Sequence, residues 1–416
     1  MRPDRLSIRI AQAVAWLVAI SLHPTIAWAA PGVIAALEEA PIIVVAEVER
    51  ITRLAHAGYL ADLDVTRSLH AEGRLPESLV IAWEEPAPSR SPRFEKGQRL
   101  LVAVGALSSA SIWRIRVPDD AARAALLEVA GGGEGYLSRP MSGELDVIEH
   151  YLAVAVEARE GDAGALHLAR LCAVGQPKIA MDAARRLADF EGLSDHLLPG
   201  AAHAIVDALL RPQMERTSAL LLEMIAEQRP VALRTALDQR IRSLQPRVPL
   251  VLYGALGATE GRLDDAVTET LLAGESSEAR VTAVRYAEGP EASAQLRALL
   301  RTDRSPAVRA EAVTRLVRLD GIAALSDLTR ALEDPAAPVR LAAVRAAATL
   351  DPQAVAALRS VAGNDSSDAA RAAIAALSLM GREAHAVLTE MAAEHPDEAM
   401  RLLSRIAIGQ PIGDRH

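Results

Sequence analysis

The sequence predicts a multidomain α+β protein in which a small five-stranded β-barrel-like domain precedes an all-α solenoid. Three observations support this fold class. Short runs rich in β-branched residues occupy the stretch from Pro41 to about Val117. Residues 143–408 then carry helical periodicity almost without interruption. The C-terminal third repeats itself with a period of about 31 residues, which is typical of stacked helix pairs.

Residues 1–29 have the pattern of a secretory signal peptide. Arginines precede an uninterrupted apolar stretch over residues 13–20, and small residues follow up to Ala29. We therefore expect cleavage between Ala29 and Ala30 and a periplasmic or secreted location in a bacterium, reached by a Sec-type signal. The alternative is an uncleaved anchor helix, but Pro24 ends the apolar run short of the roughly 20 residues that span a bilayer. No integral membrane segment is expected after cleavage.

Composition excludes several kinds of chemistry. The 416 residues carry a net charge of −9 and only 3% aromatics, which disfavours a nucleic-acid partner. Cys172 is the single cysteine, so an intramolecular disulfide and a thiolate zinc cluster are both excluded. The lysines, Lys96 and Lys178, lie outside any Gly-rich phosphate loop. The histidines lack metal-ligand spacing and no Gly-x-Ser-x-Gly elbow occurs. The sequence thus predicts no catalytic residue, no cofactor and no metal site.

The N-terminal domain is predicted to span residues 30–117. Its five expected strands lie at residues 42–48, 63–69, 79–83, 99–104 and 111–116. A polar, proline-rich loop separates the third strand from the fourth. Five short strands in about 80 residues fit a closed or nearly closed barrel, with a sandwich-like sheet as the alternative.

Three segments of this domain resemble the small OB-like or netrin-like modules of secreted proteins. They are Val-Val-Ala-Glu-Val at 44–48, Val-Thr-Arg-Ser-Leu at 65–69 and Phe-Glu-Lys-Gly-Gln-Arg-Leu-Leu-Val at 94–102. The resemblance implies a five-stranded barrel. The cysteines that form the disulfides of netrin-like domains are absent, so the resemblance does not imply a protease-inhibitor function.

Residues 118–142 are expected to form a helix and a linker. Proline followed by two acidic residues at 118–120 is a helix start, and the helix is predicted to end at Ala130. The glycine cluster at 131–133 then predicts a linker ahead of a solenoid over residues 143–410.

The repeat is clearest over residues 276–408. Its most regular feature is a set of arginines spaced by 29, 31, 31 and 30 residues: Arg280, Arg309, Arg340, Arg371 and Arg401. An aspartate stands six positions before three of them: Asp303, Asp334 and Asp365. Small apolar residues follow the first four arginines one turn along the same helix, where they can pack against a neighbour. Each repeat is therefore predicted to be an antiparallel helix pair that must stack on the next.

These features resemble HEAT repeats, particularly the short-period repeats of phycobilisome-lyase-like proteins. The resemblance implies that the aspartates lie in the turn inside each repeat and the arginines in the first turn of its second helix. It also implies a structural ladder of hydrogen bonds between adjacent repeats. The pattern is diffuse over residues 143–275, and the whole region would hold about eight repeats.

Four further arginines are candidates for binding a partner. They are expected on the exposed side of the second helices: Arg285, Arg315, Arg318 and Arg345. In HEAT solenoids the second helices line the concave face, so the resemblance implies a mildly basic trough that suits an acidic peptide or polysaccharide. The alternative is a set of ordinary solvated arginines.

We therefore expect an exported, non-enzymatic scaffold that binds another protein through its solenoid. One alternative is a bilin-lyase-like or other ligand-handling enzyme built on the same repeats. A second is a protease inhibitor that acts through the β domain.

Overall fold

The computed structural model describes residues 32–53, 58–71, 77–84, 94–107, 126–130, 135–212, 214–289, 291–350, 352–363 and 368–409. The expected signal segment with Ala29 and Ala30, the strand at 111–116 and Asp365 lie outside these residues. The described residues divide into two compact units, which meet in the sequence at Glu260 and Gly261. We refer to them as the N-terminal unit and the C-terminal unit.

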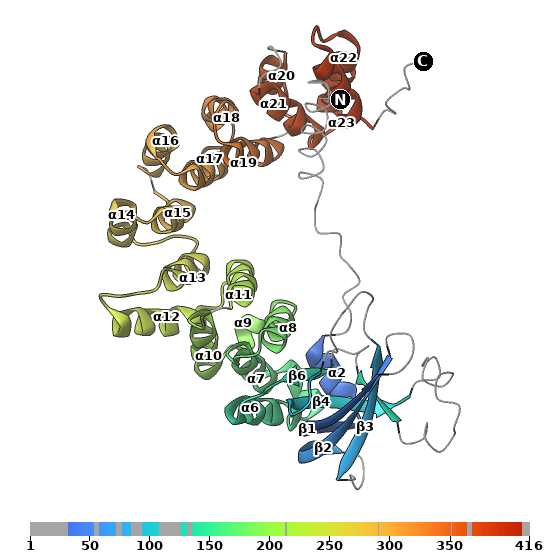
Figure 1. The fold of residues 1–416 in the computed structure, drawn as a ribbon. Helices are drawn as coiled ribbons and strands as arrows, with labels where there is room; N and C mark the ends of the chain where they lie inside the picture. The colour runs from blue at the N-terminus through green and yellow to red at the C-terminus, as the bar shows by residue number, and fades with distance from the viewer. Residues whose placement is uncertain are drawn as a thin grey trace, which may run out of the picture. The chain divides into compact units, whose positions relative to one another are not determined.

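The N-terminal unit begins with a short helix and a closed barrel (Figure 1). The elements are α2 (Val33–Glu39), β1 (Ile42–Arg53), β2 (Gly58–Ala71), β3 (Ser78–Glu84), β4 (Arg99–Ala106), β5 (Leu126–Val129) and β6 (Tyr136–Ser138). Strand β1 pairs antiparallel with both β2 and β4, and β2 pairs antiparallel with β3. Strand β5 lies between β3 and β4: it pairs parallel with β3 and antiparallel with β4. The five strands β1 to β5 therefore close a barrel, and β6 adds to β4 beside β5. The predicted β-barrel followed by an all-helical region is confirmed.

The barrel is filled by alternate residues of its strands and by a cluster of rings. Val44, Val102 and Ile81 are completely buried in the interior, because successive side chains of a strand point to opposite faces. Tyr59 stacks on Trp83 with 5.4 Å between ring centroids, and Phe94 packs edge-on to Trp83 at 4.8 Å. Three of the eleven Phe, Trp and Tyr side chains of the chain thus pack together in this core.

Two of the expected elements differ from the structure. The helix predicted to end at Ala130 is strand β5 at Leu126–Val129, while the residues before it lie outside the described part. The short apolar run closes the barrel by pairing with both β3 and β4, and this pairing outweighs local helix propensity. The expected linker also contains β6, so the β domain extends to Ser138, beyond the predicted limit at residue 117. A Cβ on Gly135 would lie 3.2 Å from Ala36, so glycine permits the close approach of β6 to α2.

Helices follow in two rows within the N-terminal unit. They are α6 (Ser142–Leu152), η1 (Val156–Glu160), α7 (Asp162–Cys172), α8 (Pro177–Ala188), α9 (Leu193–His196), α10 (Pro199–Leu209), α11 (Glu215–Gln228), α12 (Val231–Leu244) and α13 (Leu250–Glu260). One row is formed by α7, α10 and α12, and the other by α8, α11 and α13. The region with the diffuse repeat therefore also consists of stacked helix pairs.

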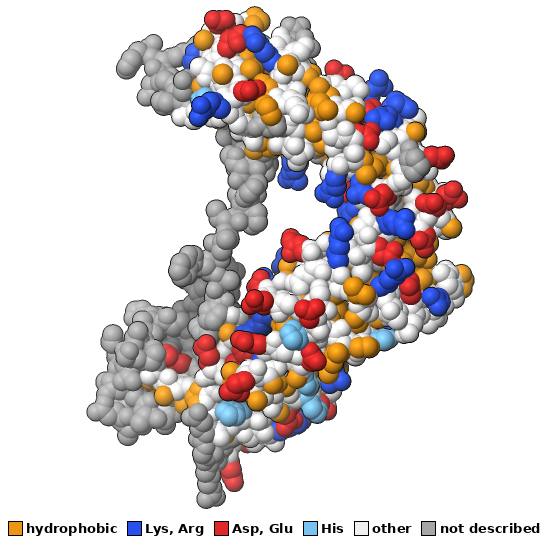
Figure 2. Space-filling view, turned by 180° about the vertical axis from the view of Figure 1, so that it is seen from behind, with side chains coloured by type: hydrophobic (Ala, Val, Ile, Leu, Met, Phe, Trp, Pro, Cys, Tyr) orange, Lys and Arg blue, Asp and Glu red, His pale blue; other side chains and the backbone are white. Residues whose placement is uncertain are grey.

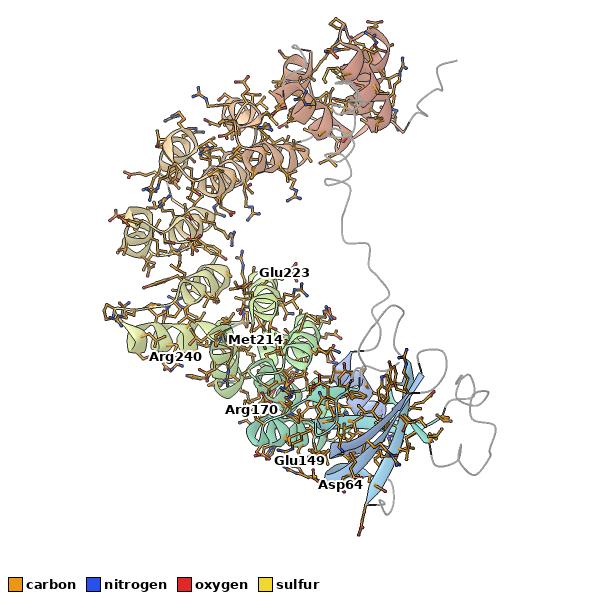
Figure 3. All side chains as sticks on the ribbon, viewed as in Figure 1. Asp64, Glu149, Arg170, Met214, Glu223 and Arg240 are labelled. Carbon is orange, nitrogen blue, oxygen red and sulfur yellow. The ribbon has the colours of Figure 1, made fainter. Side chains whose placement is uncertain are left out.

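The barrel is held against these helices by direct contacts. Glu38 of α2 forms an ion pair with Arg159 at 3.2 Å and with Arg186 at 2.8 Å, and it accepts a hydrogen bond from the Tyr151 hydroxyl. On the other side, Arg67 of β2 forms an ion pair with Glu149 of α6, which Figure 3 labels. The barrel and the first helices therefore form one unit. The glycines of the expected linker, residues 131–133, lie outside the described residues.

The described residues of the C-terminal unit form five helix pairs. Their first helices are α14 (Asp265–Ala273), α16 (Ala292–Thr302), α18 (Leu325–Leu332), α20 (Val355–Ala362) and α22 (Arg382–Glu394), with η2 (Gly321–Ala324) ahead of α18. Their second helices are α15 (Ser277–Arg285), α17 (Pro306–Asp320), α19 (Ala337–Ala348), α21 (Asp368–Ser378) and α23 (Glu398–Ala407). Each second helix packs on the next second helix, whereas neighbouring first helices make few contacts or none (Figure 1). The second helices therefore form the more tightly packed row of this unit.

Buried side chains of this unit form one continuous apolar core. Val308, Ala312 and Leu316 of α17 are fully buried, and the equivalent Val339 and Ala343 of α19 are as well. An isolated helix pair could not bury these faces, so each pair depends on its neighbours. Among the described residues, no helix is both long enough and apolar enough to span a bilayer.

Candidate functional site

The repeated arginines join neighbouring helix pairs. Arg280 at the start of α15 donates through Nε and Nη2 to the two carboxylate oxygens of Asp303, at 2.8 and 3.1 Å. Arg309 of α17 binds Asp334 in the same way, at 2.8 and 2.9 Å. The third nitrogen of Arg309 donates to the backbone carbonyl of Asp303 in its own turn, at 2.8 Å. Each guanidinium thus ties the turn of one helix pair to the aspartate of the next.

These aspartates are buried and ionised. The side chain of Asp303 is 6% exposed and that of Asp334 is 10% exposed. Burial alone would raise the pKa of both carboxyls, but the bound guanidiniums and the backbone N–H two residues later hold both pKa values below the usual range. The pairs are therefore structural charges with their hydrogen-bonding capacity largely used.

The ladder changes towards its C-terminal end. Arg340 donates to the backbone carbonyls of Asp334 and Pro335, at 2.8 and 2.9 Å, and forms an ion pair with Asp368 at 2.9 Å. Arg371 also binds Asp368. In the last pair, Arg401 donates to the carbonyls of two turn residues, including Pro396 at 3.1 Å. Asp365, expected as the next aspartate, lies outside the described residues, and Asp368 takes the carboxylate position next to Arg340.

The four candidate binding arginines, which we term the arginine face, lie on α15, α17 and α19. Arg285 of α15 is half exposed but forms a two-point ion pair with Glu311 of α17, at 3.0 and 3.2 Å. Arg315 donates to the Ala287 carbonyl at 2.9 Å, and its pKa is lowered by burial and by the charge of Arg318. Arg318 and Arg345 are exposed to solvent. Of the four candidates, Arg285 and Arg315 are therefore already engaged by contacts within the unit.

The charge around the arginine face is mixed. Because both lysines precede Gly261 in the sequence, every blue side chain over the C-terminal unit in Figure 2 is an arginine. On the face of this unit that Figure 2 shows, arginines lie among acidic side chains.

The cysteine and the histidines are the other candidates for chemistry in the described part of the chain. No group of three or more His, Cys, Asp or Glu side chains there could hold a metal ion. Cys172 is completely buried, and burial raises the pKa of its thiol, which keeps it out of the reactive thiolate form. His167 stacks near His150 with ring centroids 6.4 Å apart, and burial lowers its pKa. These histidines belong to the packing of α6 on α7.

Two arrangements had no signal in the sequence. One is the Glu38 cluster between the barrel and the helices, whose members lie more than 100 residues apart in the chain. The other is a groove over α7, lined from three separate helices and including Arg170 and Arg211. Neither follows the repeat period, so spacing could not reveal them.

Comparison with known proteins does not assign the chain to a family. Neither a scan against protein-family models nor a search of curated proteins found a match to this chain.

Proposed function

We propose that the protein is an exported, non-enzymatic scaffold, whose helix pairs form a HEAT-type solenoid that binds another protein through the arginine face. Binding is centred on the exposed Arg318 and Arg345, and the partner presents acidic side chains. The observation that carries the proposal is the closely packed row of second helices, which presents these two cations on one unit.

Three features support this function. The aspartate–arginine ladder fixes the angle between successive pairs, so side chains on the second row keep defined positions. Stacked helix pairs characteristically present extended binding surfaces. The strand order of the closed barrel also suits the OB-like resemblance, which suggests a second binding module.

Export is the part of the proposal that rests on residues 1–29. When the full chain is expressed in a bacterium, the mature protein is expected in the periplasmic fraction with Ala30 as its first residue. N-terminal sequencing of that fraction measures this directly. A chain that keeps its first 29 residues and stays with the membrane would contradict cleavage.

Charge reversal tests the binding surface. The double variant Arg318→Glu/Arg345→Glu is expected to weaken capture of the partner from an envelope extract by about tenfold, because like charges then face each other. Quantitative mass spectrometry of the captured proteins, at low and at physiological salt, provides the measurement.

The matched control reverses two exposed arginines on first helices, Arg301→Glu/Arg330→Glu, with the same change in net charge. This control is expected to retain the partner. Equal retention by both double variants would argue against the arginine face, and loss in the control alone would move the surface to the first helices.

A further inference from the structure

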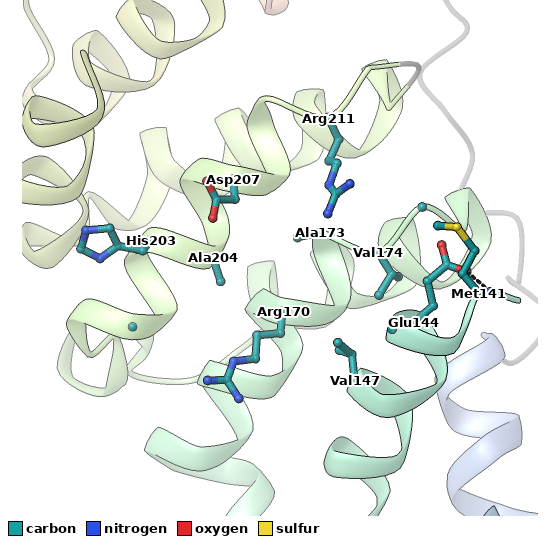
Figure 4. Close-up of a pocket in the computed structure, with 13 residues that line it drawn as sticks. Met141, Glu144, Val147, Arg170, Ala173, Val174, His203, Ala204, Asp207 and Arg211 are labelled. Atoms are coloured by element: carbon teal, nitrogen blue, oxygen red, sulfur yellow. Dashed lines mark hydrogen bonds between the residues drawn. The ribbon is translucent and has the colours of Figure 1, made fainter. Parts of the chain in front are cut away.

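A second surface on the N-terminal unit has the form of a binding groove. It lies between α6, α7 and α10 and has a volume of about 660 Å³ (Figure 4). Helix α7 packs against both α6 and α10 and so forms the floor. Small residues line it from all three helices, among them Gly143, Ala173 and Ala204. The small side chains leave the space that larger ones would fill.

The acidic and imidazole groups of this groove are already engaged. Glu144 is 5% exposed, and its carboxylate accepts the backbone N–H of Met141 at 2.9 Å as part of the helix cap. Asp207 forms an ion pair with Arg240 at 3.2 Å. His203 places Nδ1 2.7 Å from the backbone carbonyl one turn earlier in α10. Each of these groups thus already has a partner within the unit.

The two arginines of the groove, unlike these groups, have no ion-pair partner among the described residues. Arg170 lies in the last turn of α7 and Arg211 just beyond the end of α10, and both are exposed. In Figure 4 the guanidinium of Arg211 extends towards Ala173. Within the described ranges, neither guanidinium has a carboxylate within ion-pair distance. Each therefore presents a planar set of donors to an incoming acceptor.

We propose that this groove binds an acidic peptide segment of a partner protein, which places carboxylates on Arg170 and Arg211 and small apolar side chains on the floor between them. The groove is open along its length, since Met141 at one end is 62% exposed and most other lining residues also contact solvent. An open groove of this kind suits an extended chain, and a flexible methionine adapts to different side chains. The site lies on the N-terminal unit and does not depend on the arginine face.

Binding of a defined peptide to the full chain tests the proposal. The probe is a fluorescent peptide of about eight residues that alternates glutamate and alanine, with the glutamine–alanine peptide as its neutral counterpart. Fluorescence anisotropy is expected to show saturable binding of the acidic peptide and at least about tenfold weaker binding of the neutral one. An unlabelled single-stranded oligonucleotide of equal charge serves as a competitor.

Three variants locate the binding site. Arg170→Glu/Arg211→Glu is expected to weaken binding by at least about tenfold, whereas Arg216→Glu, an exposed arginine on α11 outside the groove, is expected to change it less than about twofold. Ala204→Phe fills the groove without any change in charge and is also expected to abolish saturable binding. Circular dichroism verifies that each variant remains folded.

Several results would overturn the proposal. These are unchanged affinity in Arg170→Glu/Arg211→Glu, equal binding of the neutral peptide, or equally effective competition by the oligonucleotide. Loss of binding only in Arg318→Glu/Arg345→Glu would assign the peptide to the arginine face and would also overturn it. Loss of partner capture in that variant with retained peptide binding supports two separate sites.

Discussion

Replacing Asp334 with alanine is expected to lower the free energy of unfolding of the C-terminal unit by about 3–5 kcal/mol. The substitution leaves the guanidinium of Arg309, which is 13% exposed, without its two-point partner. It also removes the acceptor of the Ala336 N–H at the start of α19. Removal of one partner from a buried ion pair costs far more than the net contribution of the intact pair. Urea unfolding followed by circular dichroism provides the measurement.

A half-exposed pair in the same unit is the matched control. Glu390→Ala removes the partner of Arg359, where both side chains are about half exposed, and is expected to cost less than about 1 kcal/mol. Hydrogen exchange then locates the effect of Asp334→Ala, which is expected to accelerate exchange in α17 and α19 before other helices. A loss below about 1 kcal/mol for Asp334→Ala would mean that the ladder does not hold the pairs together.

The same carboxylates predict an acid-side loss of stability. Their pKa values are lower in the folded unit than the unfolded value of about 3.9, so their contribution is complete above that value. It declines as the pH falls through the folded-state pKa values. The double variant Asp303→Asn/Asp334→Asn is expected to be less stable at neutral pH and to lose less stability between about pH 5 and pH 2 than the parent.

Replacing Glu38 with alanine is expected to lower the stability of the N-terminal unit by about 3 kcal/mol. The carboxylate is 18% exposed and serves Arg159, Arg186 and the Tyr151 hydroxyl together. Without the Glu38 carboxylate, the guanidiniums of Arg159 and Arg186, which are 17% and 31% exposed, keep no carboxylate between them. The expected consequence is separation of α2 from α6, η1 and α8, which increased hydrogen exchange in α2 and α8 would report.

The control for Glu38 is an exposed pair on the barrel itself. Arg50 is 75% exposed beside Asp62, so Arg50→Ala is expected to change stability by less than about 0.5 kcal/mol. An equally small effect of Glu38→Ala would show that apolar contacts alone hold α2 against the helices.

Local patterns in the sequence were sufficient to predict most strands of the barrel. The β-branched run after Pro41 and the alternation around Val65 each form a strand, β1 and β2. Strand β5 was missed because its four residues follow an acidic helix start, and only pairing with two distant strands makes them extended. Register between distant strands depends on tertiary packing that a local pattern does not contain.

The repeat period located the ladder residues but not their partners. Spacing placed Asp303 six positions before Arg309, yet the Asp303 carboxylate binds Arg280 and only its backbone carbonyl binds Arg309. The pairing of Arg285 with Glu311 was missed for the same reason, since it joins two helices. A period identifies equivalent positions in successive pairs, whereas contacts between pairs depend on how they stack.

Photocrosslinking tests most directly whether the row of second helices is the docking surface. Thr314 of α17 and Thr329 of α18 are matched, because both are partly exposed and donate a hydroxyl to a carbonyl of their own helix. A benzophenone amino acid at position 314, the repeat equivalent of Arg285 and Arg345, is expected to crosslink a partner in the native envelope, and one at position 329 is not. Crosslinks of equal yield from both positions, or from position 329 alone, would contradict a partner bound on the second helices.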